Sequence, residues 1–311
     1  MLKTTSLFIS LQLIFIISFG QKSDELKILA DEIYSRKDGM ALTMDMIAPT
    51  NSPNRAAVVI IVSGGYRSGP FFDSPLSRTN MTEAFTSRGF TVFTVAHGAS
   101  PVYSIPDILE DVKLSIRYIR KNADSLGVDA NRIGAYGSSS GGHLAMSLGV
   151  IDNDVDLESE DEIGRFSSKV NAVVAFFPPT DYLNFGGPGV LAEESGLLDG
   201  GGRPAPFNFH RIDPESGHYV RIVDESVRLE ITRAISPIYD ISADDAPILL
   251  LHGDADPRVP IQQSLDAYEK FQAAGVVSEL HIEENGGHGR WESMPERMEQ
   301  SASWFEVNLL D

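Results

Sequence analysis

The chain has no cysteine, so it can form no disulfide bond, no thiolate metal site and no cysteine nucleophile. It is also poor in basic residues, because 25 Lys and Arg stand against 44 Asp and Glu, giving a formal net charge of −19. Nucleic acids and anionic membrane surfaces would repel such a chain. Neither is therefore expected as a partner, and a hydrophobic core must hold the fold together.

Long hydrophobic runs are missing as well, except near the start. An uncharged apolar run at residues 7–19 follows Lys3, and small residues stand at Ser18 and Gly20. This pattern is typical of a secretory signal peptide, and the run is shorter than the roughly 20 residues that span a bilayer. We expect cleavage after Gly20 and a secreted or periplasmic mature domain of residues 21–311, free of the membrane. An uncleaved anchor is the alternative.

Six short apolar or β-branched segments have the length of strands. They lie at residues 56–62, 90–96, 132–137, 171–177, 247–253 and 278–284, and Gly, Pro, Asn or Asp bound them. Their apolar residues are continuous rather than alternating, which favours strands buried on both faces. The composition, 42% hydrophobic and 22% charged, suits a globular domain with a large core.

Amphipathic helices are expected between these strands. Residues 104–107 (SIPD) form a capping box, and apolar residues then recur at positions 108, 112, 116 and 119. Residues 293–296 (SMPE) repeat the device before a helix with apolar residues at 298, 302, 305 and 309. Strands that alternate with helices predict a mostly parallel, doubly wound α/β sheet flanked by helices.

Two segments interrupt this alternation. Residues from about 182 to 236 are rich in Gly, Pro and polar residues and too long for an ordinary loop, so they predict an insertion over the sheet. The acidic run at residues 152–162 spaces three Asp residues as a calcium loop does. However, Leu157 and Ile163 occupy the places where an EF-hand needs Gly and Glu. A solvated acidic loop fits better.

The segment GSSSG at residues 137–141 lies between a predicted strand and a predicted helix. It matches G-x-S-x-G, in which a sharp strand-to-helix turn exposes the central serine hydroxyl. Ser139 is then the candidate nucleophile. Taken alone, the same five residues would also suit a linker or a turn, so the rest of the chain must decide.

A serine hydroxyl needs a base, and the base needs a carboxylate to orient it. On this type of sheet the carboxylate and then the histidine follow the serine along the chain. Asp254 and Asp256 follow the strand at 247–253, and we choose Asp256, which lies beyond the turn; exchanged roles are the alternative. His288, in a Gly-rich loop after the last strand, meets both the order and the placement.

An oxyanion needs hydrogen-bond donors, and the segment SGGYRSG follows the first predicted strand. The backbone amides of Gly65, Tyr66 and Ser140 are the candidate donors. Aromatic residues that could line an acyl pocket are Tyr182, Phe207, Phe209 and Trp291, although aromatic residues in an insertion serve packing as often.

These motifs together resemble an α/β-hydrolase of the carboxylesterase type, similar to the hormone-sensitive-lipase-like and the acetylxylan or feruloyl esterase-like groups. The matching segments are SGGYRSG (63–69), GSSSGGHLA (137–145), FFPPTD (176–181), SPIYDIS (236–242), HGDADPRVP (252–260) and GGHG (286–289). The sequence departs at Ser63, where the family usually has His, and at Tyr66. The resemblance implies hydrolysis of short acyl esters, acetyl or feruloyl, on small molecules or glycans, without metal or cofactor.

Three other functions are weighed against this one. A prolyl-oligopeptidase-like peptidase shares the order of the triad but usually carries a large propeller domain. A long-chain lipase would need an apolar lid, whereas residues 186–218 are polar and rich in Gly. A non-catalytic binding protein on the same fold would typically lack a triad member. The sequence carries no signal for oligomeric state.

Overall fold

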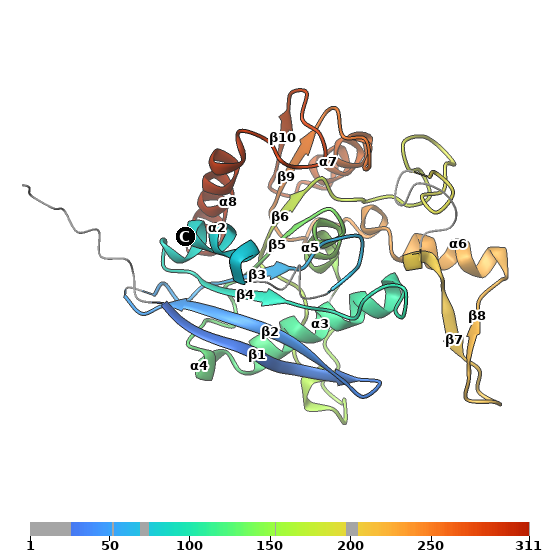
Figure 1. The fold of residues 1–311 in the computed structure, drawn as a ribbon, viewed down its shortest axis with the longest axis horizontal. Helices are drawn as coiled ribbons and strands as arrows, with labels where there is room; N and C mark the ends of the chain where they lie inside the picture. Colours follow the sequence, from blue (N-terminus) through green and yellow to red (C-terminus); the bar gives the residue numbers. More distant parts are fainter. Residues whose placement is uncertain (1–25, 52, 69–74, 153, 197–204, 311) are drawn as a thin grey trace, which may run out of the picture.

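The computed structural model describes residues 26–51, 53–68, 75–152, 154–196 and 205–310, so the predicted signal peptide lies outside the described residues. The centre is an eight-stranded sheet with the order β1-β2-β4-β3-β5-β6-β9-β10 (Figure 1). Its strands are β1 (Leu26–Lys37), β2 (Met40–Pro49), β3 (Ala57–Ile61), β4 (Thr91–Val95), β5 (Ile133–Ser138), β6 (Ala172–Phe176), β9 (Ile248–Gly253) and β10 (Ser278–Glu283). Within this sheet, the six neighbouring strands β4, β3, β5, β6, β9 and β10 pair in parallel. The predicted mostly parallel sheet is confirmed.

All six predicted strands are present, but β1 and β2 were not predicted. They form an antiparallel hairpin, and β2 joins the sheet antiparallel to β4. β1 is an edge strand that is mostly exposed, and its register with β2 shifts twice. Because charged residues and these irregularities break its alternation, β1 lacks the pattern by which a strand is recognised.

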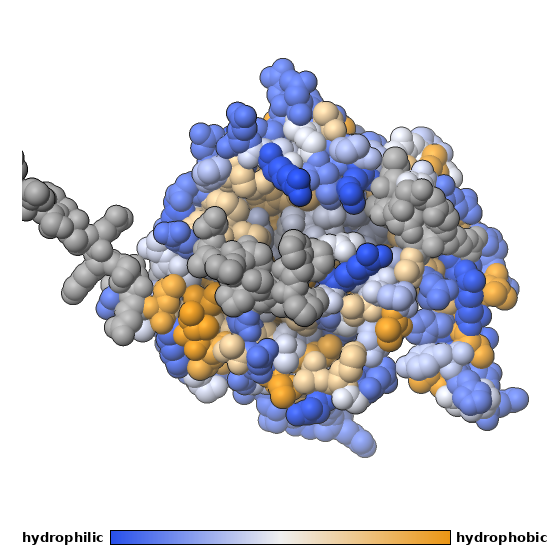
Figure 2. Space-filling model, viewed as in Figure 1, coloured by the Kyte–Doolittle hydropathy of each residue, from blue (hydrophilic) through white to orange (hydrophobic). Residues whose placement is uncertain are grey.

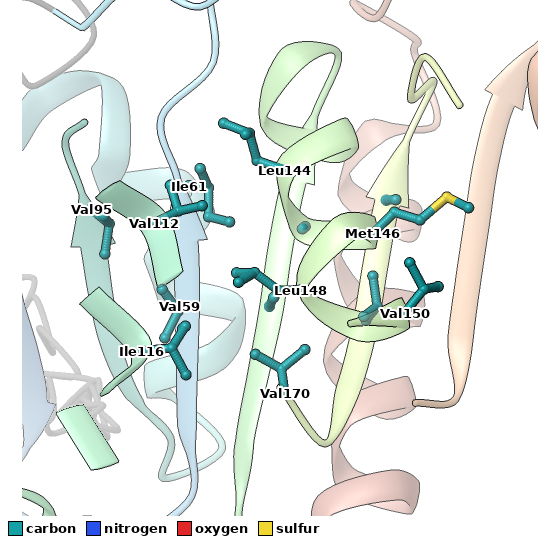
Figure 3. Packing of buried hydrophobic residues seen from close by; sticks show 14 of the residues in the cluster. Val59, Ile61, Val95, Val112, Ile116, Leu144, Met146, Leu148, Val150 and Val170 are labelled. Carbon is teal, nitrogen blue, oxygen red and sulfur yellow. The ribbon is translucent and has the colours of Figure 1, made fainter. Parts of the chain in front are cut away.

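Helices cover both faces of the sheet (Figure 1). Residues of α3 (Ile105–Lys121), α5 (Ser140–Val150) and α7 (Gln262–Ala274) belong to one buried cluster, and residues of α2 (Pro75–Thr86) and α8 (Met294–Leu309) to the other. In Figure 3, Ile61 of β3 lies between Val112 of α3 and Leu144 of α5, and Val59 lies beside Ile116 of α3. None of the helices in the described ranges has both the length and the apolar character needed to cross a bilayer.

The two predicted capping boxes have different outcomes. At α3 the backbone amide of Ser104 donates to Asp107 Oδ2 at 2.9 Å, as expected. At α8 the box is wrong, because Ser293 has φ −75° and ψ 2°, whereas a capping residue needs an extended backbone. Its hydroxyl is buried without a hydrogen-bond partner. The helix still begins at Met294, and its predicted apolar face is buried.

The described part of the predicted insertion holds η2 (Ala205–Phe207), a hairpin of β7 (His210–Ile212) and β8 (Tyr219–Arg221), and α6 (Glu225–Ala234). The hairpin points away from the sheet, and both hydrophilic and hydrophobic side chains cover the visible face around it (Figures 1 and 2). The remaining short helices are α4 (Ala123–Leu126), η1 (Glu162–Arg165) and η3 (Pro237–Tyr239). In the acidic segment, Asp154 pairs with Arg117 of α3 at 2.8 Å, so this carboxylate anchors the loop.

Candidate active site

The turn between β5 and α5 holds Ser139 in a strained conformation. Its φ of 52° and ψ of −122° lie in a region that residues other than glycine rarely adopt. The turn also leaves no room beside it: a Cβ on Gly137 would lie 2.1 Å from the carbonyl oxygen of Gly141, and a Cβ on Gly141 would lie 2.6 Å from that of Ile61. The spacing G-x-S-x-G is therefore a steric requirement of this turn, and a flexible linker is ruled out.

Three side chains meet at the carboxyl ends of β5, β9 and β10. His288 Nε2 lies 3.0 Å from Ser139 Oγ, and His288 Nδ1 lies 2.7 Å from Asp256 Oδ2. The residues that sequence reasoning joined across 149 positions thus form one continuous hydrogen-bonded chain. Asp254 takes no part in it, because its residue is exposed and its amide donates to the carbonyl oxygen of Glu283.

The carboxylate of Asp256 is fully buried and has donors on both oxygens. Oδ1 accepts from the backbone amides of Arg258 at 2.8 Å and Val259 at 3.0 Å, and Oδ2 faces His288. Burial by itself would raise the pKa of Asp256, but the hydrogen bonds from His288 and the two amides outweigh it and hold that pKa below its ordinary value. The carboxylate is therefore ionised at neutral pH.

Two aromatic residues hold the loop that carries His288. The Phe177 ring centre lies 4.5 Å from that of the His288 ring. Trp291 donates from its indole nitrogen to the carbonyl oxygen of Gly287 at 2.8 Å. Trp291 is also 7% exposed and packs against Phe177, so the structure places it behind the histidine loop rather than along a substrate path.

The loop after β3 contacts the first residue of α5. Gly64, Gly65 and Tyr66 all have positive φ, and the Gly65 amide donates to Ser140 Oγ at 3.1 Å. Ser63 Oγ lies 3.4 Å from the same hydroxyl. The Ser140 amide is the first of the helix and has no partner within it. Gly65, Tyr66 and Ser140 thus line one cavity with Ser139, and in this structure the Gly65 amide is bonded to Ser140 Oγ.

A buried polar network lies beneath this loop. Tyr66 Oη is hydrogen-bonded to Tyr182 Oη and to His143 Nδ1, the latter at 3.0 Å, and His143 Nε2 lies 2.7 Å from the carbonyl oxygen of Ile235. Since a carbonyl can only accept, Nε2 donates and Nδ1 accepts from Tyr66, which fixes a neutral imidazole. Sequence reasoning missed this role, although His143 stands one helical turn after Ser139.

We expect the free energy of unfolding to decrease as pH is lowered, because of His143. Burial lowers its pKa from 6.5 to about 4, opposed only in part by the hydrogen bond to Ile235. Between these values the unfolded chain binds a proton that the folded chain excludes, so the free energy of unfolding decreases as pH falls. One such group contributes a loss of about 2 kcal/mol between pH 7 and 5.

Urea unfolding of the wild type and His143→Gln at pH 7 and 5 measures this effect. The variant should be less stable at pH 7 but lose about 2 kcal/mol less on acidification, because Gln does not titrate. His252, whose pKa burial also lowers, contributes equally to both proteins. Parallel pH dependences of the two proteins would contradict the assignment.

Two cavities flank Ser139 and His288. One of about 530 Å³ is lined mainly by apolar residues, among them Ile60, Met81 and Phe177. The other, of about 320 Å³, is lined by Phe207 together with Arg67, Arg258, Pro179 and the loop after β3. Of the four aromatic residues predicted to line a pocket, only Phe207 lines a cavity that contains Ser139. Tyr182 and Phe209 are almost fully buried, at 0% and 1% exposure, and serve packing.

Comparison with known proteins agrees with this architecture. Esterase LipC of Mycobacterium tuberculosis is 25% identical over 261 residues, which cover 81% of this chain and 58% of LipC, so the chain spans little more than half of that relative. A truncated carbohydrate esterase from gut microbiota superposes with a TM-score of 0.70 at 24% identity, covering 92% of this chain and 97% of the other.

A second solved structure, the propionate-bound esterase 2 of Thermogutta terrifontis, superposes with a TM-score of 0.66 at 25% identity, over 89% of this chain and 93% of the other. These likenesses give the chain the α/β-hydrolase fold. The BD-FAE family profile matches residues 44–271, which is well over half of the sequence. The chain therefore belongs to the BD-FAE family.

Proposed function

We propose that this protein is an exported serine carboxylic-ester hydrolase. The observation that carries the proposal is the unbroken hydrogen-bonded chain from Ser139 through His288 to the ionised Asp256, on a strained turn that exposes the serine hydroxyl. Relatives that are named esterases support the same chemistry. Export rests on residues 1–20 of the sequence.

The geometry suits a two-step acyl transfer. Ser139 Oγ attacks the ester carbonyl carbon while His288 Nε2 accepts its proton, and Asp256 stabilises the resulting imidazolium. Amides of Tyr66 and Ser140 stabilise the oxyanion, joined by that of Gly65 once it exchanges its hydrogen bond to Ser140 Oγ for one to the oxyanion. Collapse of this intermediate breaks the bond to the alcohol oxygen, which takes the proton from His288. A water molecule then repeats the sequence on the acyl-enzyme and releases the acid.

The proposed acyl groups are short, acetyl or feruloyl. The cavity of about 530 Å³ is within the size range of small-molecule pockets, and its apolar wall of Ile60, Met81 and Phe177 suits an acyl group. Thermogutta esterase 2, whose structure holds propionate, also supports a short acyl group. Attachment of that group to a glycan is part of the proposal and comes from the resemblance in sequence.

The test is hydrolysis of 4-nitrophenyl acetate, butyrate and decanoate and of methyl ferulate by the chain from residue 21. We expect kcat/KM for acetate or butyrate to exceed that for decanoate by about tenfold, as the proposed preference for short acyl groups requires. A preference for decanoate would indicate a lipase. Cleavage of a proline-containing peptide amide without ester turnover would indicate a peptidase.

A further inference from the structure

We infer that the alcohol part of the substrate carries a negative charge, which Arg67 and Arg258 bind beside the scissile ester. The inference rests on the proposed function and narrows its substrate class. Both arginines line the cavity of about 320 Å³ that contains Ser139 and His288. Arg258 also lines the larger cavity, so it stands where the two meet at the nucleophile.

Neither guanidinium is engaged elsewhere. Over the described residues, the side chains of Arg67 and Arg258 have no ion pair and no hydrogen bond, whereas Arg88, Arg117 and Arg228 are all paired with carboxylates. Arg258 contributes only its backbone amide to Asp256. Both side chains are exposed and therefore free to receive a ligand.

The lining of the two cavities beside Ser139 differs in charge from the rest of the chain. Acidic residues outnumber basic ones by 44 to 25, yet no carboxylate is among the described residues that line the two cavities. The long-range field of the protein repels anions, so two unpaired arginines at the nucleophile do not serve solubility. A guanidinium binds carboxylate and sulfate groups through paired hydrogen bonds.

The two cavities also differ in a way that assigns the charge to the alcohol. The larger one is mainly apolar and suits the acyl group. The smaller one holds both arginines, so it offers positive charge, and Phe207, itself only 1% exposed, forms part of its wall. An aromatic or sugar alcohol with a carboxylate or sulfate group fits this second cavity.

The experiment compares two acetate esters that differ in charge alone. 4-Carboxyphenyl acetate is anionic at pH 7, and 4-carbamoylphenyl acetate is its neutral counterpart with the same acyl group. We measure kcat/KM for both with the wild type, Arg67→Gln, Arg258→Gln and the double variant. Arg36→Gln is the control, because it removes one positive charge from an exposed position on β1. 4-Sulfonatophenyl acetate with its sulfonamide distinguishes a sulfonate from a carboxylate preference.

We expect the ratio of kcat/KM for the anionic over the neutral ester to fall about fivefold in each single variant and about 20-fold in the double variant. The ratio should also fall as NaCl is raised, since salt screens exposed charges. Arg36→Gln should keep the wild-type ratio. Taking a ratio removes any general effect of the substitutions on the catalytic groups.

The two possible failures can be told apart. If the wild type hydrolyses the neutral ester through Ser139 but the double variant keeps the wild-type ratio, the charge preference is wrong and the proposed function stands. If the wild type hydrolyses neither ester nor the nitrophenyl esters, both are wrong. A ratio that falls equally in Arg36→Gln would assign the effect to net charge and overturn the roles of Arg67 and Arg258.

Discussion

Ser139→Ala lowers kcat for ester hydrolysis by about 10⁴- to 10⁶-fold, while the protein stays folded. The substitution removes the hydroxyl of the turn that is hydrogen-bonded to His288, and it leaves Gly137, Gly141 and the β5–α5 backbone as they are. Residual hydrolysis comes from the oxyanion donors and from substrate binding, which the variant retains. Ester turnover under saturating 4-nitrophenyl acetate measures the loss.

Ser125→Ala serves as the matched control, because it removes an exposed serine hydroxyl on α4 that hydrogen-bonds only to the carbonyl oxygen of Asn122. It should keep full turnover. Circular dichroism and thermal unfolding establish that Ser139→Ala has the wild-type fold. If folded Ser139→Ala retained more than about a hundredth of the wild-type kcat, the covalent mechanism through this residue would be wrong.

Asp256→Asn should lower kcat by about 10⁴-fold through the tautomer of His288. Oδ1 accepts two backbone amides, from Arg258 and Val259, so the amide oxygen of an asparagine would take that place. Its NH₂ group would then face His288 Nδ1 and force that nitrogen to accept. The ring proton would move to Nε2, which could no longer accept the proton of Ser139.

Asp254→Asn provides the comparison, since it changes a carboxylate two residues away that does not contact His288. It should retain turnover within a fewfold of the wild type. The pH dependence of kcat gives a second measurement, because Asp256→Asn should recover part of its activity at high pH, where hydroxide can replace the lost base. Exchanged behaviour of the two variants would make Asp254 the orienting carboxylate.

Local sequence predicted the parts of this protein that neighbours along the chain decide. Ser139 was predicted from the glycines at 137 and 141 that flank it. The structure shows why they are needed, because a Cβ at these positions would lie only 2.1 Å and 2.6 Å from backbone oxygens. Five strands were recognised by continuous apolar residues because they are buried on both faces. Burial on both faces was wrong for β10, an edge strand in which no residue is fully buried. β1 escaped notice because its edge position permits charged residues on both faces. β2 lies inside the sheet and buries Leu42, Met44 and Met46 at alternate positions, a strand pattern that the sequence analysis overlooked.

The choice of Asp256 was a sequence inference from order and turn position, and the structure places that carboxylate against His288. The prediction that Trp291 lines an acyl pocket was wrong. An aromatic residue after a candidate base gives no local sign of whether it faces substrate or packs behind the loop. The tertiary structure decides such cases, because burial depends on what other segments cover.

The sequence by itself thus determined the strand-to-helix turn at Ser139, the six central strands, the order of the triad and the absence of cysteine chemistry. Only the tertiary structure decided that Tyr66, His143 and Tyr182 share one buried network and that Arg67 and Arg258 line one cavity with Ser139. The physical reason is distance along the chain. Glycine sterics act between near neighbours, whereas Arg67 and Arg258 line one cavity because the strands that precede their loops, β3 and β9, end at the same edge of the sheet.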